Sequence, residues 1–430
     1  MTELASYLVP GFFVSDHVIP VPLDWADESW GRIDLFYRVV VDPAKRNEDL
    51  PLLVFLQGGP GGAGPRPNQG PAWLKEAVKH YRVILPDQRG TGRSSLVDGE
   101  DIARYDDPAE AAWYLRKFLA DSIVQDLEHL RHSMFGGQRW TALGQSYGGF
   151  LTLTYLSHAP GALNAALIAG GVPGVPASAA DVYRHTFPRA ERRSREFYRR
   201  FPKDLDTVAL VADRLAEGDV TLPNGDALTI PRFQSIGLDL GMKPGYERLH
   251  WLIDTAFARP GRLSDAFLYD VMNRTATAEN PLYWTLQEFV YGSGANGPID
   301  WAAAHELERH PEFEPGARPL LFFGEMAFPW MFHDVYELRP FKQAVELMMR
   351  QVEWPLLYDP ARLAANEVPV EAAVYFDDLY VDSGLQLETL QGLGNSHAWV
   401  TNEYEHDGLR TGDVFARLHS LLQDRGGPLA

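Results

Sequence analysis

The sequence predicts an α/β protein with a mostly parallel central sheet, helices on both faces and an inserted, mostly helical cap. Short apolar runs without alternation, PLLVFLQ from Pro51 and RVILPD from Arg82, suit strands buried on both faces of a parallel sheet. Segments with a helical pattern, such as AWLKEAVKHY and FLADSIVQDLEHLRHSMF, separate these runs. Such alternation of strand and helix is typical of right-handed crossover units.

Further strand-like runs stand on either side of these units. The first fifty residues alternate apolar and polar positions, as in GRIDLFYRVVVD, and predict an antiparallel strand pair that opens the sheet. WTALGQ and LNAALIAGG continue the series, and PLLFFGE and VPVEAAVYF predict that strands return towards the C-terminus. The segment DVFARLHSLLQDR predicts a final helix.

The middle of the chain lacks this alternation. From about Val175 to Pro319, helical stretches such as YERLHWLIDTAF dominate. We therefore expect a first core part at 1–174, a cap at 175–319 and a second core part at 320–430. The cap carries a basic run, RAERRSREFYRRFPK, which acidic residues interrupt, and we interpret it as a solvated helix face.

Composition excludes several classes of protein and of site. A formal net charge of −19 disfavours nucleic acid as a partner, because such a surface repels phosphate backbones. The sequence has no cysteine, which excludes disulfides, thiolate zinc sites and a cysteine nucleophile. No secretion signal and no run of the ~18 apolar residues that a membrane span needs is recognisable. We expect a soluble, cytoplasmic protein without a membrane partner.

The motif GQSYGG fits the pattern G-x-S-x-G at 144–149, between a strand-like run and a helical one. A sharp strand-to-helix turn of this kind exposes a strained serine at the carboxyl edge of the sheet. Ser146 is therefore the predicted nucleophile. The amide of Tyr147, at a helix N-terminus, is a predicted donor to an oxyanion.

A second donor to the oxyanion is predicted in the glycine-rich loop that follows PLLVFLQ. Backbone N–H groups of such a loop can approach a substrate closely, and Gly59 is the expected donor. Glycine-rich loops also bind phosphates, but the pattern G-x-x-x-x-G-K-[ST] is absent from this loop. Nucleotide binding is therefore unsupported.

Three motifs in order, QGGPGG, PDQRGTGRSS and GQSYGG, resemble those of the proline iminopeptidases, α/β-hydrolase serine peptidases. The resemblance is sharpest over 52–174 and weak in the cap. It implies an α/β-hydrolase fold and an exopeptidase that releases an N-terminal residue, preferably proline, without a metal or organic cofactor. Gln57 replaces the histidine that precedes the glycines in the family, and Asp87 and Arg89 resemble a structural ion pair there.

Two histidines, His397 and His406, compete for the role of catalytic base. In this fold the triad follows the order Ser, Asp/Glu, His, and the acid and base lie on loops after the last two strands. The run able to form the final strand is HAWVT, and His397 is its first residue. His406 lies beyond the other end of that strand and is the predicted base.

The acid is expected at the end of VPVEAAVYF, where Asp377 and Asp378 follow. In the family the acid follows a G-x-x-D loop, and YFDD places Asp378 in that position. Asp377 is the main competitor, and Asp382 lies farther from the strand. Glu325, which ends PLLFFGE, is a rival triad acid, but this role would leave VPVEAAVYFDD unexplained.

We prefer another role for Glu325, because GEMAFPWMF resembles a segment of iminopeptidases whose glutamate binds the free α-amino group of the substrate. A buried carboxylate suits that ammonium group. Glu288 in the cap is a second candidate, although a solvent-facing helix acid is an equal interpretation. Trp284, Phe328 and Trp330 could form a pocket for a proline ring or simply belong to the core.

The predicted function is thus a serine exopeptidase that acts on small peptides with a free N-terminus, through an acyl-enzyme. The alternative is an esterase or amide hydrolase of the same fold without selection for a free amine. An epoxide hydrolase would carry aspartate in place of Ser146, and a binding module would be expected to lack the triad.

Overall fold

The computed structural model describes residues 2–68, 72–294 and 296–429. Within these residues, nine strands form one sheet in the order β1-β2-β3-β5-β4-β6-β7-β10-β11. Strands β1, β2 and β3 pair antiparallel, as do β3 and β5, and every pair from β5 to β11 is parallel. The bounds are β1 Thr2–Val9, β2 Phe12–Pro22, β3 Arg32–Val41, β4 Leu52–Leu56, β5 Arg82–Pro86, β6 Trp140–Gln145, β7 Leu163–Ala169, β10 Val370–Tyr375 and β11 Ser396–Thr401.

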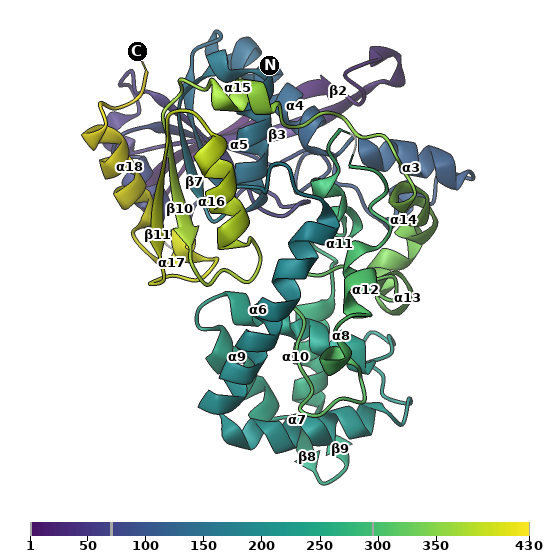
Figure 1. Cartoon of the computed structure of the whole chain (residues 1–430). Coiled ribbons are helices and arrows are strands. Elements are labelled where there is room, and N and C mark those ends of the chain that lie inside the picture. Colours follow the sequence, from purple (N-terminus) through teal and green to yellow (C-terminus); the bar gives the residue numbers. More distant parts are fainter. Residues whose placement is uncertain (1, 69–71, 295, 430) are drawn as a thin grey trace.

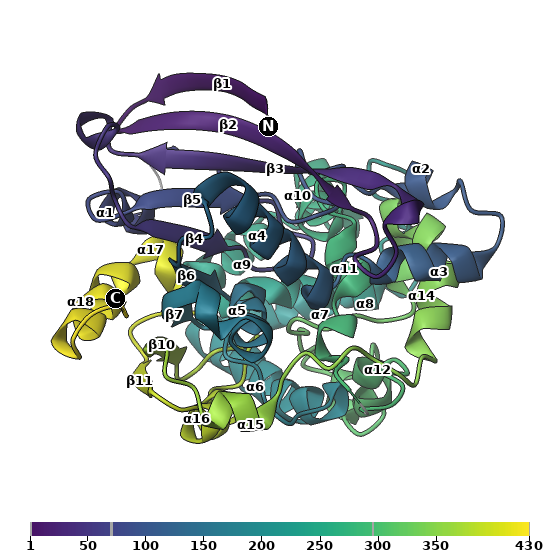
Figure 2. The same ribbon diagram turned by 90° about the horizontal axis from the view of Figure 1, so that it is seen from above.

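The apolar runs form the parallel strands, as the sequence predicts. All residues of β4, β6 and β10 are buried. Alternate residues of β4 enter two different hydrophobic clusters, one on each face of the sheet. The antiparallel pair is also confirmed, and a third strand extends it: β1, β2 and β3 form one edge of the sheet in Figure 2.

Helices cover both faces of the sheet. One cluster joins the sheet to helices α4, α5, α15 and α16, and the other joins it to α1, α17 and α18. The bounds are α1 Ala72–Ala77, α4 Ala120–Phe135, α5 Tyr147–His158, α15 Pro360–Ala364, α16 Ser383–Gly392, α17 Gly408–Thr411 and α18 Val414–Asp424. This arrangement is the α/β layering that the sequence predicts.

A cap stands between β7 and β10, and Figure 1 shows most of it below the sheet. Its helices share a third hydrophobic cluster with α2 and α3, which follow β5. Among the described helices, none combines the length and apolar character needed to cross a bilayer. The bounds are α2 Gly99–Ile102, α3 Pro108–Arg116, α6 Ala179–Arg200, α7 Pro202–Leu215, α8 Ile230–Gln234, α9 Gly245–Asp254, α10 Asp265–Thr275, α11 Leu282–Leu286, α12 Ala302–Leu307, α13 Met331–Asp334, α14 Lys342–Met349, β8 Phe257–Arg259 and β9 Arg262–Leu263.

The prediction of a strand at PLLFFGE is wrong. Residues 320–324 are buried but belong to no strand. The N–H of Phe322 donates to Ser194 Oγ (3.0 Å) and the N–H of Phe323 to the carbonyl of Gln234 (3.0 Å), so cap groups bind this backbone. The division of the chain at 174 and 319 stays a prediction, and the packing of 320–349 with the cap favours a later return to the core.

Candidate active site

Ser146 occupies a sharp turn between β6 and α5. Its backbone has φ 56° and ψ −126°, a positive φ that is uncommon for a residue other than glycine. The Ser146 N–H donates to the carbonyl of Ala169 (3.1 Å), and the Ser146 carbonyl accepts from the Gly149 N–H (2.8 Å). These bonds hold the strained turn against β7 and α5. Tyr147 is the first residue of α5, so its N–H has no acceptor within the helix.

His406 and Asp378 face each other on the loops that follow β11 and β10. Nδ1 of His406 lies 2.8 Å from Oδ2 and 3.1 Å from Oδ1 of Asp378, 28 positions earlier. Asp378 is fully buried, and its Oδ1 also accepts from the N–H groups of Tyr380 (2.8 Å) and Val381 (3.1 Å). The carboxylate is therefore fixed from two sides. Because Asp378 bonds to Nδ1 of His406, the Nε2 atom of His406 is available to another group.

The environment of His406 affects its pKa in two opposing directions. Burial disfavours the imidazolium and lowers the pKa, whereas the Asp378 carboxylate favours it by charge and by hydrogen bonding. Glu325 also raises the pKa and Arg410 lowers it, and the net result is a raised pKa. The site therefore stabilises a proton on His406, which is what a base needs once it has accepted one.

Ser146 and His406 line one cavity of about 180 Å³, to which Leu238 and Met242 of the segment between β7 and β10 also contribute. The glycine-rich loop after β4 approaches Ser146 closely: a Cβ at Gly58 would lie 2.9 Å from Ser146 Cβ. Gly59 has φ 134°, a backbone conformation that residues other than glycine rarely adopt. The cavity is lined by Gly58, Gly59, Gln145, Ser146, Leu238, Met242, Tyr283, Glu325, Tyr380, His406, Asp407 and Arg410.

Glu325, directly after the segment 320–324, is a carboxylate that lines this cavity. The Tyr283 hydroxyl donates to its Oε1. Burial raises the pKa of Glu325, and Asp378 adds to that effect, while His406 and Tyr283 oppose it. A ligand ammonium group beside Glu325 would offset the unfavourable desolvation of the carboxylate.

Glu288 lies elsewhere, away from the lining of this cavity. Its Oε2 accepts from the N–H of Ala302 (3.1 Å) and its Oε1 from that of Ala303 (3.0 Å), the first residues of α12. Burial raises the pKa of Glu288 to about 8. Both carboxylate oxygens are thus used at a helix N-terminus, which supports a structural role. The alternative interpretation of Glu288 as a solvent-facing helix acid is wrong, since the residue is 1% exposed.

The competing residues of the sequence analysis make other contacts. Nδ1 of His397 lies 2.9 Å from Oε2 of Glu371, on β11 and β10. The carboxylate of Asp377 is 40% exposed and lies 3.4 Å from Arg192. Asp382 caps α16, where it accepts from the N–H of Leu385 (2.9 Å). Within the described residues, none of these three side chains bonds to His406.

The ion pair expected between Asp87 and Arg89 is absent, which corrects the inference from the family. Oδ1 of Asp87 accepts from Arg66 (2.7 Å) and from the N–H of Gly64 (3.0 Å). Arg89 is fully buried and pairs with Asp126 of α4, Nε to Oδ2 2.7 Å. Both residues are structural, but each holds a different neighbour of the glycine-rich loop.

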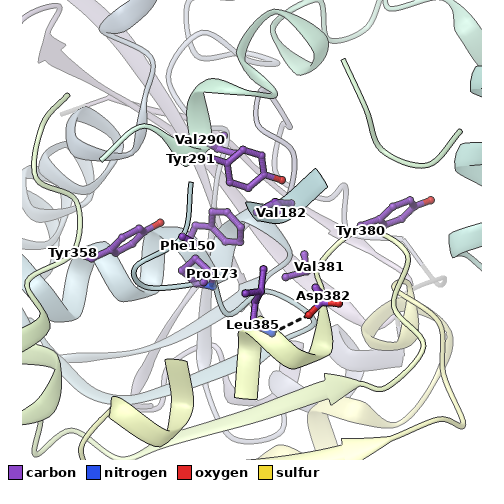
Figure 3. A pocket seen from close by; sticks show the side chains of 12 residues that line it. Phe150, Pro173, Val182, Val290, Tyr291, Tyr358, Tyr380, Val381, Asp382 and Leu385 are labelled. Carbon is purple, nitrogen blue, oxygen red and sulfur yellow. Dashed lines mark hydrogen bonds between the residues drawn. The ribbon is translucent and has the colours of Figure 1, made fainter. Parts of the chain in front are cut away.

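Tyr283, Tyr380 and Arg410 line the cavity but were not predicted from the sequence. The rings of Tyr380 and His406 meet edge to face, with centroids 4.6 Å apart. Figure 3 shows a second, mostly apolar hollow that shares Tyr380 with this cavity. Its volume of about 20 Å³ holds about one water molecule. The pocket proposed for Trp284, Phe328 and Trp330 stays a prediction, as none of them lines either space.

Comparison with known proteins places the chain in a family. The alpha/beta hydrolase fold family matches residues 51–256. A proline iminopeptidase of Aeromonas sobria is 41% identical over 99% of this chain and 100% of its own length. The chain belongs to the proline iminopeptidase family. A second proline iminopeptidase, from Aspergillus aculeatus, is 32% identical over 94% of this chain and 92% of its own length.

The match covers the cap as well as the core, so the weak resemblance of the cap motifs does not mark a different family. Proline iminopeptidases are alpha/beta hydrolases, in agreement with the sheet order and helix layers described above. A solved esterase of Thermogutta terrifontis also aligns with 95% of this chain, at 12% identity and a TM-score of 0.44.

Proposed function

We propose that this proline iminopeptidase-family protein is a serine exopeptidase that releases an N-terminal residue, preferably proline, from small peptides. The observation that carries the proposal is the buried contact of Asp378 with His406, which lines one cavity together with Ser146 and Glu325. The family assignment supports the same reaction. A free substrate N-terminus and a cytoplasmic location are part of this proposal.

The chemistry follows from the arrangement of the three side chains. Nε2 of His406 takes the proton of Ser146 as Oγ forms a bond to the scissile carbonyl carbon. Asp378 holds the imidazole in the required tautomer and balances its charge. His406 then gives the proton to the leaving nitrogen as the C–N bond breaks. Water, deprotonated by His406, hydrolyses the acyl-enzyme and restores Ser146.

The oxyanion needs two donors that already point at its position. The N–H of Tyr147 at the start of α5 is one, and the N–H of Gly59 in the facing loop is the other. The close approach of Gly58 to Ser146 supports this assignment, because a larger residue would hold the loop away. Neither donor depends on a side chain, so point substitution of the donors themselves is uninformative.

Selection for a free amine is assigned to Glu325. This carboxylate lines the same cavity as Ser146, so the ammonium group of the residue that acylates Ser146 would lie in that cavity too. Tyr283 and Gln287 bond to the same carboxylate and hold it in place beside the cavity. The bound cation would compensate a carboxylate whose burial is unfavourable.

The test compares prolyl amides with a neutral acyl ester in wild type and in Glu325→Gln. Both substrates use Ser146 and His406, so the ratio of the two kcat/KM values separates amine recognition from chemistry. We expect Glu325→Gln to lose roughly 10- to 150-fold on prolyl amides, from a charge-assisted contact of ~1.5–3 kcal/mol. Ester cleavage should change much less.

Two controls complete the comparison. Ser146→Ala should abolish cleavage of both substrates, and N-acetylation of the prolyl substrate should cost wild type at least as much as Glu325→Gln does. Equal losses on amide and ester would make Glu325 structural or catalytic. Indifference of the wild-type enzyme to acetylation would refute the aminopeptidase proposal and favour an esterase or amide hydrolase without amine selection.

A further inference from the structure

The basic run of helix α6 contains two arginines that do not face solvent. Arg189 donates from Nη1 to the carbonyls of Phe376 (3.1 Å) and Asp378 (3.2 Å). Its Nε donates to Oδ2 of Asp382 (2.7 Å) and its Nη2 to Ser383 Oγ (3.0 Å). The guanidinium of the cap helix thus binds the loop after β10, on both sides of Asp377.

Arg193, one turn further along α6, binds the same loop and a second one. Its Nη2 donates to the carbonyl of Asp377 (2.7 Å) and to Oε2 of Glu405, the residue before His406. Its Nη1 donates to the Tyr246 hydroxyl (3.2 Å), and the residue is only 5% exposed. A buried arginine with these partners restrains the backbone next to Asp378 and the side chain of the residue before His406.

Other arginines of α6 differ in burial and in partners. Arg192 and Arg195 have side chains that are 53% and 52% exposed. Arg195 pairs with Glu191 on the same helix, one turn away (2.7 Å). Exposed pairs of this kind contribute little to stability, whereas breaking a buried pair leaves an uncompensated charge. The interpretation of the whole run as a solvated face is therefore wrong for Arg189 and Arg193.

The loop that α6 holds is the support of the acid. The Asp378 carboxylate is oriented by the N–H groups of Tyr380 and Val381 in the turn that continues from this loop. Asp382 ends the turn, and Figure 3 shows its bond to Leu385 beside the hollow that Val182 of α6 also lines. The loop backbone therefore depends on contacts at both its ends.

We propose that Arg189 and Arg193 are positioning residues for the proposed Asp378–His406 pair. Between them they bind three consecutive carbonyls around the acid and the carboxylate that precedes the base. Neither arginine lines the cavity that holds Ser146, so they act through other residues. The inference rests on the proposed triad but adds that the cap, through α6, sets its geometry.

A shift in pH dependence distinguishes positioning from a general loss of folding. The charged groups that influence His406 are Asp378, Glu325 and Arg410. Because Asp378 raises the pKa of His406, a looser contact between them lowers that pKa. The acid limb of kcat/KM, where His406 becomes protonated, then moves to lower pH. A smaller folded fraction would lower the rate without moving the limb.

Glu405 titrates in the same region, so its surroundings enter the same argument. Burial raises its pKa to about 7, Arg193 and Lys243 lower it, and Asp378 raises it. Removal of Arg193 raises the pKa of Glu405 further, which favours the uncharged form of the residue beside His406. The change in the acid limb then reports the contact of His406 with Asp378.

The experiment uses the full chain with substitutions at the two arginines and at Arg195. Arg193→Gln should lower kcat on prolyl amide and acyl ester alike by about 10- to 100-fold, as expected for misplaced catalytic groups, with KM little changed. Arg193→Lys should recover part of the loss, since one donor can still reach one acceptor. Arg189→Lys keeps a cation beside Asp382 but loses carbonyl contacts and should also lower kcat. Arg195→Gln, on the same helix, should leave kcat near wild type.

The rate at which a fluorophosphonate labels Ser146 gives a second readout that does not depend on the true substrate. It should fall with kcat in Arg193→Gln, and the acid limb should move to lower pH. Normal labelling and an unmoved limb in the folded arginine variants would overturn the positioning role, as would an equal loss in Arg195→Gln. Full labelling of Ser146→Ala would instead overturn the proposed function itself. If Arg193→Gln does not fold, Arg193→Lys and Arg189→Lys decide between these outcomes.

Discussion

At the scale of single residues, we predict opposite effects on activity when His397 and His406 are each replaced by alanine. His406→Ala removes the partner of Asp378, which is the proposed base for Ser146, and should lower kcat by several orders of magnitude. His397 is 47% exposed at its side chain and pairs with Glu371, which Arg425 also binds, so His397→Ala should retain most activity. Steady-state kinetics of the two variants on one prolyl amide checks this. Activity that survives in His406→Ala but not in His397→Ala would reverse the assignment.

The neighbouring aspartates at 377 and 378 permit the same matched comparison. In Asp378→Asn the amide can still accept from the N–H groups of Tyr380 and Val381, but its NH₂ then faces Nδ1 of His406. His406 would adopt the wrong tautomer, at a cost of about 10⁴-fold in kcat. Asp377→Asn changes a half-exposed carboxylate and should cost far less. Near-normal turnover of Asp378→Asn, with an inactive Glu325→Gln, would transfer the acid role to Glu325.

The sequence predicted these residues because their positions follow from local rules. The turn at Ser146 is a pattern of glycines between a strand and a helix, and the order of strands places Asp378 and His406 at one edge of the sheet. Arg193 has no such local signature. Its burial depends on how α6 packs against loops 184 and 212 positions away, which neither spacing nor charge in its own segment reveals.

At the scale of elements, the segment 320–324 and helix α6 show where pattern alone fails. A short apolar run is equally compatible with a buried strand and with a buried irregular segment. Its hydrogen-bonding neighbours in space decide which of the two forms. Here Ser194 of α6 and Gln234 bind the backbone of the segment. The same helix bonds to the loop after β10 through Arg189. Helix α6 therefore contacts the loop of the proposed acid and the segment that ends at Glu325.

At the scale of the whole molecule, several buried groups bind protons more tightly in the folded chain than in the unfolded one. Burial raises the pKa of Glu288 from 4.5 to about 8 and that of Glu405 from 4.5 to about 7. The pKa of His406 is also raised. Between the unfolded and folded pKa values the native state holds the extra protons, so the free energy of unfolding falls as pH rises. A net charge of −19 acts in the same direction through repulsion.

Thermal unfolding should therefore occur at a lower Tm at about pH 8.5 than at about pH 5.5, by calorimetry on the wild-type chain. Glu288→Gln removes the titration of the most strongly shifted of these carboxyls and should shrink the difference in unfolding free energy by a few kcal/mol. Glu388→Gln, the same substitution at an exposed position of α16, should leave the difference unchanged. A Tm that rises with pH over this range, or a Glu288→Gln variant with the full wild-type difference, would show that Glu288 is already ionised in the native state. The N-terminus of α12 would then stabilise its carboxylate more than burial disfavours it.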